Sequence, residues 1–346
     1  MMGEHVQVGS HKIWTEQVGT GPDVLLIGGL GDTVESWRFQ LDRLTDRYRL
    51  TAFDSPGGGR TAMLGGKLTV EMLADDTARL LRTLGIPIAH VAGFSEGSII
   101  AQELAIRHPE LVRSLILQST WLVPDICLRT FDRCVRWMVE TAPGEREFLE
   151  ALYLYLYTAR AHNDGTVERI IGDVLNFPHK HGAAEMLTFL EAIANRDAAD
   201  RLHMITAPTL VLAGGADRVT RPKLGREVAG RIRGARFEVM SEEGHQPFQE
   251  ACEKWNARVD AFWRQVGNDA STPAVHGLGA ADKEAEVTRL MAERYGQPFT
   301  LEAEAQSSSS IDSDGGGQVV DRRAAVPDHG RVGDVSKAVA AAGDPA

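Results

Sequence analysis

Gly93-Phe94-Ser95-Glu96-Gly97 fits the pattern G-x-S-x-G and stands between an apolar run and a helical one. Residues 89–92 predict a strand before it, and the apolar residues after it predict a helix that extends to about His108. A serine on so sharp a turn has a strained backbone, and glycines two positions before and after leave room for it. The sequence therefore predicts a serine whose hydroxyl points out of one end of a sheet.

Further strands and helices alternate along the chain on both sides of this turn. Apolar runs predict strands over residues 24–27, 48–53, 111–118, 209–213 and 235–240. Helices are predicted over 70–84 and after Pro247, because apolar residues recur there at spacings of three and four. This alternation is typical of an α/β fold with a mostly parallel central sheet flanked by helices.

One interval is too long for an ordinary crossover between parallel strands. It spans about 90 residues, whereas a crossover needs only a dozen or more. Its composition is helical and rich in aromatic residues. We therefore predict a core over residues 1–120 and 202–266, and an inserted helical cap over 121–201. Residues 152–157 (Leu-Tyr-Leu-Tyr-Leu-Tyr) alternate like a strand, but we predict a helix from their surroundings, so their tyrosines should not share one face.

A serine hydroxyl becomes a good nucleophile only when a base removes its proton, and that base needs an acid to orient it. Asp217 and His245 follow the fifth and sixth of the predicted strands, in the order Ser, acid, His. They are the expected catalytic partners of Ser95, with Glu242 and Glu243 as alternative acids.

The oxyanion of an acyl-transfer reaction also needs N–H donors. We expect the backbone N–H of Glu96, directly after the serine, and that of Leu30, in the glycine-rich loop 28–32 after the first predicted strand. Gly29-Leu30-Gly31 begins like a dinucleotide-binding loop but lacks its third glycine, so no cofactor is expected.

Residues of about 10 to 266 resemble a capped single-domain α/β-hydrolase, of the kind that includes enol-lactonases, esterases and carbon–carbon bond hydrolases of degradation and secondary metabolism. Residues 54–61 (Asp-Ser-Pro-Gly-Gly-Gly-Arg-Thr) resemble the D-x-P-G-x-G-x-S turn of that family, and residues 216–220 and 244–247 resemble its acid and histidine loops. Ser95 excludes the related enzymes that use an aspartate nucleophile.

Three residues depart from the family pattern. Thr61 replaces the usual serine, which is a small change. Gly28 stands where the family usually has a histidine before the oxyanion-loop glycine. Glu96 places a carboxylate next to the serine. If that side chain pointed into the pocket it would disfavour anionic substrates; the other possibility is that it is solvated.

Charge and composition exclude several classes of protein. The net charge of −11 argues against nucleic-acid binding, which needs a basic face. We expect no membrane span, signal peptide or metal site, and a cytoplasmic location. His179 and His181 lack further ligands at a suitable spacing. Cys127, Cys134 and Cys252 are expected as small reduced core residues.

Residues 267–346 form an acidic tail with only two aromatic residues. We expect it to be mostly disordered, with one helix over 280–295. The alternative is that this helix docks on the body of the protein, on a second copy or on a pathway partner.

The sequence thus predicts a serine hydrolase in which Ser95, Asp217 and His245 act on a mid-sized, largely apolar ester, thioester or lactone through an acyl-enzyme. One alternative keeps the site but uses it for carbon–carbon bond hydrolysis, lyase or cyclisation chemistry. A second is a ligand-binding protein without catalysis, although such proteins usually lose a triad residue and none is lost here.

Overall fold

A single mixed sheet of eight strands organises the residues that the computed structural model describes, which are 3–63, 67–179, 182–194 and 196–269. The strand order is β1-β2-β4-β3-β5-β6-β7-β8, and neighbours from β4 to β8 are parallel. The strands are β1 (Glu4–Val8), β2 (His11–Val18), β3 (Asp23–Ile27), β4 (Arg49–Phe53), β5 (Ala89–Phe94), β6 (Val112–Gln118), β7 (Thr209–Gly214) and β8 (Arg236–Met240). The helix expected over 280–295 lies outside the described residues.

The six parallel strands are those that the apolar runs predicted. All but the edge strand β8 are largely buried on both faces, as in parallel sheets covered by helices. Side chains of one strand alternate between two cores. In β3, Leu25 and Ile27 enter one core, and Val24 and Leu26 enter the other.

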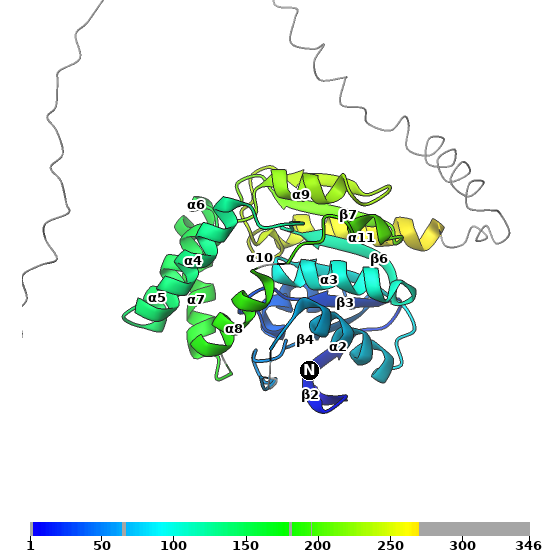
Figure 1. The fold of residues 1–346 in the computed structure, drawn as a ribbon, viewed down its shortest axis with the longest axis horizontal. Helices are drawn as coiled ribbons and strands as arrows, with labels where there is room; N and C mark the ends of the chain where they lie inside the picture. Colours follow the sequence, from blue (N-terminus) through cyan, green and yellow to red (C-terminus); the bar gives the residue numbers. More distant parts are fainter. Residues whose placement is uncertain (1–2, 64–66, 180–181, 195, 270–346) are drawn as a thin grey trace, which may run out of the picture. The chain divides into compact units, whose positions relative to one another are not determined.

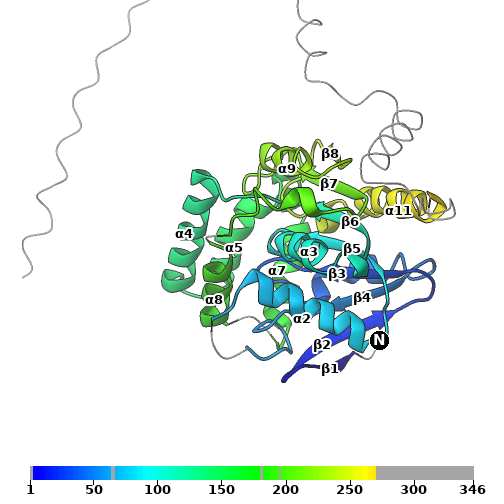
Figure 2. The same ribbon diagram turned by 45° about the vertical axis from the view of Figure 1, so that its right-hand side comes forward.

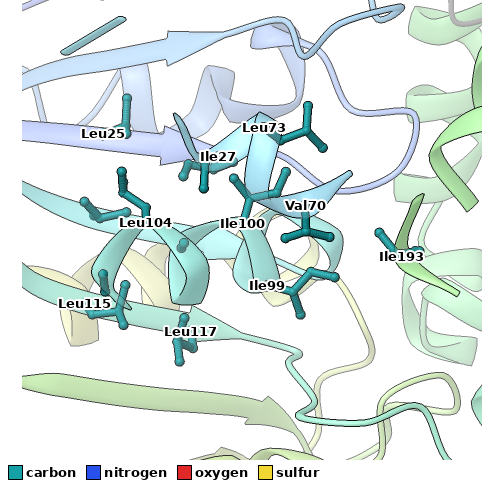
Figure 3. Close-up of a cluster of buried hydrophobic side chains, with 14 of the residues drawn as sticks. Leu25, Ile27, Val70, Leu73, Ile99, Ile100, Leu104, Leu115, Leu117 and Ile193 are labelled. Carbon is teal, nitrogen blue, oxygen red and sulfur yellow. The ribbon is translucent and has the colours of Figure 1, made fainter. Parts of the chain in front are cut away.

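Helices α2 (Val70–Thr83), α3 (Glu96–Arg107) and α9 (Pro222–Ala229) pack into the first core. Figure 2 shows α2 and α3 lying across the strands, and Figure 3 shows side chains of both helices meeting those of β3 and β6. Burying each such aliphatic side chain contributes about 1.5–3 kcal/mol.

The opposite face of the sheet packs against η1 (Val34–Trp37), α1 (Arg38–Leu41), α10 (Pro247–Glu250) and α11 (Cys252–Asp269). Three tryptophans, Trp37, Trp255 and Trp263, are fully buried there. The stack of Trp37 on Phe248, with ring centroids 4.4 Å apart, joins η1 to the segment that follows His245.

The long interval between β6 and β7 contains five helices, here called the inserted helices, within its described residues. They are α4 (Ile126–Thr141), α5 (Glu145–Leu156), α6 (Ala159–Asn163), α7 (Thr166–Asn176) and α8 (Ala183–Ile193). Figure 1 shows them gathered at one side of the sheet. As predicted, residues 152–156 are helical, and Tyr153 is buried while Tyr155 is exposed. The limits of the cap at 121 and 201 stay a prediction.

Three predictions differ from the structure. The hairpin of β1 and β2 was not predicted, because its strands are half-exposed and lack a continuous apolar run. The helix expected after Pro247 is broken at Ala251, which has extended φ (−140°), so it forms α10 and α11. The cysteines are free but not core residues: Cys127 is exposed and the other two are half-buried.

In the described part of the chain, no helix has the length and apolar character needed to cross a membrane. The short elements η2 (Pro109–Leu111) and η3 (Leu202–Met204) lead into β6 and β7.

Candidate active site

Ser95 lies where β5 ends and α3 begins, and its backbone is strained. Its φ of 51° and ψ of −120° are dihedrals that non-glycine residues rarely adopt. Such a conformation costs roughly 1–3 kcal/mol and persists only where surrounding contacts hold it. Here the Ser95 N–H donates to the Gln118 carbonyl (2.9 Å), and the Ser98 N–H and hydroxyl donate to the Ser95 carbonyl (2.8 and 2.6 Å). The serine is thus fixed between two neighbouring strands and the first turn of a helix.

The two glycines of the turn are needed for close backbone packing. A Cβ at Gly93 would lie 2.4 Å from the Gly97 carbonyl oxygen, and one at Gly97 would lie 2.3 Å from the Ile27 carbonyl oxygen. Real Cβ atoms do not approach backbone so closely, so α3 could not start against β3 and β5 with larger residues. This is the structural reason for the G-x-S-x-G spacing.

His245 joins Ser95 to Asp217 through hydrogen bonds at both ring nitrogens. Nε2 lies 3.0 Å from Ser95 Oγ, and Nδ1 lies 2.8 Å from Asp217 Oδ2. All three side chains are buried. Ser95, Asp217 and His245 follow β5, β7 and β8, so the carboxyl end of the parallel sheet brings together residues 150 positions apart.

Backbone and hydroxyl donors hold the Asp217 carboxylate in place. Its Oδ1 accepts the N–H groups of Val219 (2.8 Å) and Thr220 (2.9 Å), and its Oδ2 accepts the Thr220 hydroxyl (2.9 Å). Thr220 lies in the acid loop, residues 216–220, but no separate role was predicted for it. The alternative acids point elsewhere: Glu242 and Glu243 lie 3.7 and 2.9 Å from Lys254 Nζ.

The backbone of His245 is fixed from two directions. Its N–H donates to the carbonyl of Leu156 at the end of α5 (2.8 Å), so an inserted helix supports the histidine loop. Its carbonyl accepts the hydroxyl of Ser119 (2.8 Å), whose positive φ of 54° follows the end of β6. The imidazole therefore has a defined position even before a substrate is bound.

Electrostatics favours the protonated form of His245. Burial opposes the charge, but the carboxylate of Asp217, its hydrogen bond, and the charges of Glu96 and Asp32 outweigh this and raise the pKa of His245. An imidazole that is easily protonated suits a base that must carry a proton between two steps.

The loop after β3, expected to supply an N–H donor, is tied down by Asp32. Its carboxylate accepts the Gly29 N–H (2.8 Å), and the Asp32 N–H donates to the Gly29 carbonyl (3.2 Å). A Cβ at Gly28 would lie 2.7 Å from Asp32 Cβ. The glycine that replaces the family's usual histidine therefore leaves room for the Asp32 side chain in this turn. Burial raises the pKa of Asp32 to about 6. Hydrogen bonds from Ser36 and Gly29 lower this pKa, whereas the charge of Glu96 raises it further.

The expected donor Leu30 is already engaged in this structure. Its N–H donates to Oε2 of Glu96 at 2.8 Å. Glu96 is buried, with only 9% of the residue exposed, so the possibility that its carboxylate is solvated is wrong. Its carboxylate lies over the glycine loop, with Oε2 3.1 Å from the place of a Cβ on Gly29.

Another carboxyl group near Glu96 comes from α4. Burial, then the charge of Glu96, raises the pKa of Asp132 to about 7, against the charges of Arg136, Arg129 and Arg133. No local sequence pattern indicates a role for Asp132, because its interaction with Glu96 depends on the tertiary fold. Asp32, in contrast, stood in the quoted loop.

The turn that resembles D-x-P-G-x-G-x-S supports this end of the sheet. The buried Asp54 carboxylate accepts the N–H groups of Val34 and Arg60, each at 2.8 Å. It thereby links the end of β4 to η1. A Cβ at Gly59, which has φ +52°, would meet that carboxylate at 2.1 Å.

No group of three or more histidine, cysteine or acidic residues in the described ranges is arranged to hold a metal ion. A cavity of about 570 Å³ is lined by residues of β8 and α11, such as Arg236 and Phe262, and by neither Ser95 nor His245. The hydrogen-bond geometry around Ser95, rather than this cavity, locates the candidate site.

Comparisons with known proteins agree with this architecture. The sequence model of the alpha/beta hydrolase fold family matches residues 22–251. A relative from Azorhizobium caulinodans named "Putative carbamate hydrolase RutD" is 34% identical over 242 residues, which cover 68% of this chain and 89% of that protein.

Solved structures show the same fold. An esterase from Thermogutta terrifontis is 26% identical with a TM-score of 0.67, over 77% of this chain and 99% of that one. An enol-lactonase from Burkholderia xenovorans is 23% identical with a TM-score of 0.68, over 75% and 100%. With the family match across more than half of its length, the chain belongs to the alpha/beta hydrolase fold family and is an α/β-hydrolase enzyme.

Proposed function

We propose that this protein is a serine hydrolase that cleaves a mid-sized, largely apolar ester, thioester or lactone through an acyl-enzyme. The observation that carries the proposal is the unbroken chain of hydrogen bonds from Ser95 Oγ through His245 to Asp217. A buried serine–imidazole–carboxylate relay is the arrangement that nucleophilic acyl transfer requires.

In the first half-reaction, Ser95 Oγ attacks the carbonyl carbon while His245 Nε2 takes the hydroxyl proton. The electron pair of the C=O bond moves onto oxygen, and backbone N–H groups of Glu96 and Leu30 stabilise that oxyanion. Collapse re-forms the C=O bond, breaks the bond to the leaving group, and transfers the proton from His245 to that group. Asp217 holds the imidazole in the right tautomer and stabilises its charge throughout.

In the second half-reaction, a water molecule gives a proton to His245 and attacks the acyl carbon. The second oxyanion collapses, the bond to Ser95 Oγ breaks, and the proton returns to the serine. The carboxylic acid then leaves, and no cofactor enters any step.

The names of the relatives support a carbonyl substrate but differ in its class. Carbamate, carboxylic ester and enol-lactone all carry a carbonyl carbon next to a leaving oxygen or nitrogen. Acyl transfer at Ser95 would be suited to a substrate of any of these three classes. The small-molecule acyl substrate, the cytoplasmic location and a docking role for the tail remain predictions of the sequence.

Labelling with an alkyl fluorophosphonate tests the proposal, because the reagent reacts with activated serines. We expect wild type to be labelled at Ser95 and Ser95→Ala to be neither labelled nor active on a panel of esters, thioesters and lactones. Turnover of carbon–carbon substrates without labelling would favour the lyase or carbon–carbon alternative. Tight ligand binding without turnover would favour the non-catalytic one.

A further inference from the structure

We propose that the Glu96 carboxylate occupies the oxyanion site of the free enzyme, and that substrates must displace it, so that Glu96 selects against acyl groups that carry a negative charge. This inference rests on the proposed function, because it concerns the site at which the substrate's carbonyl oxygen would bind. It assigns a specificity-determining role to a residue next to the nucleophile.

The geometry places the carboxylate on one of the two expected donors. Glu96 Oε2 accepts the Leu30 N–H at 2.8 Å, across 66 positions of sequence. A hydrogen bond from an N–H group to a carboxylate is about twice as strong as one between neutral groups. The hydrogen bond is also partly buried, and Glu96 itself is only 9% exposed. Leu30 therefore has a strong acceptor before any substrate arrives.

A substrate carbonyl has to compete for that N–H group. An N–H group makes one strong hydrogen bond. The backbone N–H groups of Leu30 and Glu96 can therefore hold an oxyanion together only after the Glu96 carboxylate has left the Leu30 N–H. The Glu96 side chain cannot leave the site altogether, because Glu96 is the first residue of α3 and directly follows Ser95. The displaced carboxylate stays beside the bound acyl group.

The surrounding charges reinforce a preference for neutral or cationic acyl groups. Asp32, from the loop after β3, and Asp132, from α4, both interact electrostatically with Glu96. Three arginines of the same helix, Arg136, Arg129 and Arg133, oppose this effect at Asp132. An anionic acyl chain placed next to Glu96 would meet like charge in a partly buried site, where repulsion is stronger than in bulk water.

The hydrogen bond between Leu30 and Glu96 has a second interpretation. It could serve only to hold the loop 28–32 in the conformation that catalysis requires. The two interpretations predict opposite effects of substitution. If Glu96 occupies the oxyanion site, weakening its bond frees the donor and speeds attack on Ser95. If Glu96 only positions the loop, Glu96→Ala slows the reaction and the near-isosteric Glu96→Gln restores it.

The first measurement is the second-order rate of fluorophosphonate labelling of Ser95, since the phosphoryl oxygen enters the oxyanion site. We expect Glu96→Gln to label faster than wild type, because an amide is a weaker acceptor than a carboxylate. Glu96→Ala should be fastest, by about 10- to 100-fold, as expected when a charged hydrogen bond no longer has to be broken. Glu140→Gln, at an exposed carboxylate on α4, is the matched control and should stay within about twofold of wild type.

The second measurement compares three 4-nitrophenyl esters of six-carbon acyl chains: hexanoate, 6-aminohexanoate and the mono-ester of hexanedioate. Wild type should discriminate against the anionic chain in kcat/KM. Glu96→Gln should reduce that discrimination at least about tenfold, since one unit of like charge is removed close to the substrate.

Circular dichroism and thermal unfolding confirm that each variant is folded. Equal labelling rates in wild type and both Glu96 variants, or the slower Glu96→Ala rescued by Glu96→Gln, would overturn the inference while leaving the serine hydrolase standing. Unchanged discrimination against the anionic ester in Glu96→Gln would overturn the claim of charge selection. Folded proteins that are never labelled, in any variant, would instead overturn the proposed function itself.

Discussion

Replacing Gly97 by alanine forces the start of α3 away from β3. The new Cβ would lie 2.3 Å from the Ile27 carbonyl oxygen and 2.4 Å from that of Gly28, at the end of β3 and the start of the loop that carries Leu30. Both neighbours are backbone atoms, so no side chain can rotate to relieve the contact. Helix and strand must therefore separate by several tenths of an ångström in a closely packed region.

Overpacking of this kind costs roughly 1–3 kcal/mol, against about 0.5–1 kcal/mol gained when alanine replaces glycine in a helix. Each lost kcal/mol should lower Tm by about 2–4 °C in a domain of this size. The effect on chemistry is larger, because a displacement of about 1 Å between reacting groups can cost 100-fold in rate. We expect Gly97→Ala to remain folded but to be labelled by fluorophosphonate roughly 10- to 100-fold more slowly.

Gly172→Ala in α7 is the matched control. A Cβ there meets nothing within 4 Å, and Gly172 does not have a positive φ. This variant should gain about 0.5–1 kcal/mol in stability and keep wild-type labelling. Thermal unfolding and labelling rates measured side by side test the comparison. Wild-type stability and wild-type labelling in Gly97→Ala would refute the packing argument for the turn.

Four further predictions concern the site and its supports. Asp217→Asn should lower kcat/KM about 10³–10⁴-fold on any ester that wild type turns over, since the amide favours the wrong imidazole tautomer, and near-normal rates would contradict the assignment. His245 must be neutral to act as a base and its pKa is raised, so kcat/KM should fall with decreasing pH at a midpoint above the ordinary 6.5. Asp32→Asn removes one negative charge and should move this midpoint to lower pH, and an unmoved or raised midpoint would be inconsistent with the cause given. Tyr157→Phe removes a buried hydroxyl that donates a hydrogen bond to Gln246, and should lower the free energy of unfolding in urea by about 1 kcal/mol. An unchanged free energy of unfolding would show that this hydrogen bond does not stabilise the protein.

The sequence was most informative where one local pattern had one physical cause. Ser95, Asp217 and His245 each follow an apolar strand, and parallel strands bring such positions to one edge of a sheet. The turn around Ser95 also needs glycines, because the backbone of α3 packs closely against β3 and β5 in this fold. The fold class and the positions of the three residues could therefore be predicted without coordinates.

Other features depend on contacts between distant segments or on weak patterns. The hairpin of β1 and β2 carries few buried residues, so its alternation was easily overlooked. The bond from Leu30 to Glu96 depends on how α3 packs against the loop after β3, and residue types alone allowed a solvated carboxylate. Asp132 reaches the site only through the packing of α4.

The most direct test of the central claim is the mass of Ser95 during turnover. Wild type is mixed with a 4-nitrophenyl ester, quenched in acid within milliseconds to seconds, digested and examined by mass spectrometry. We predict that the peptide containing Ser95 gains the mass of the acyl group and that this adduct decays as the acid product appears. Turnover without an adduct on Ser95, or turnover that persists in Ser95→Ala, would contradict the account.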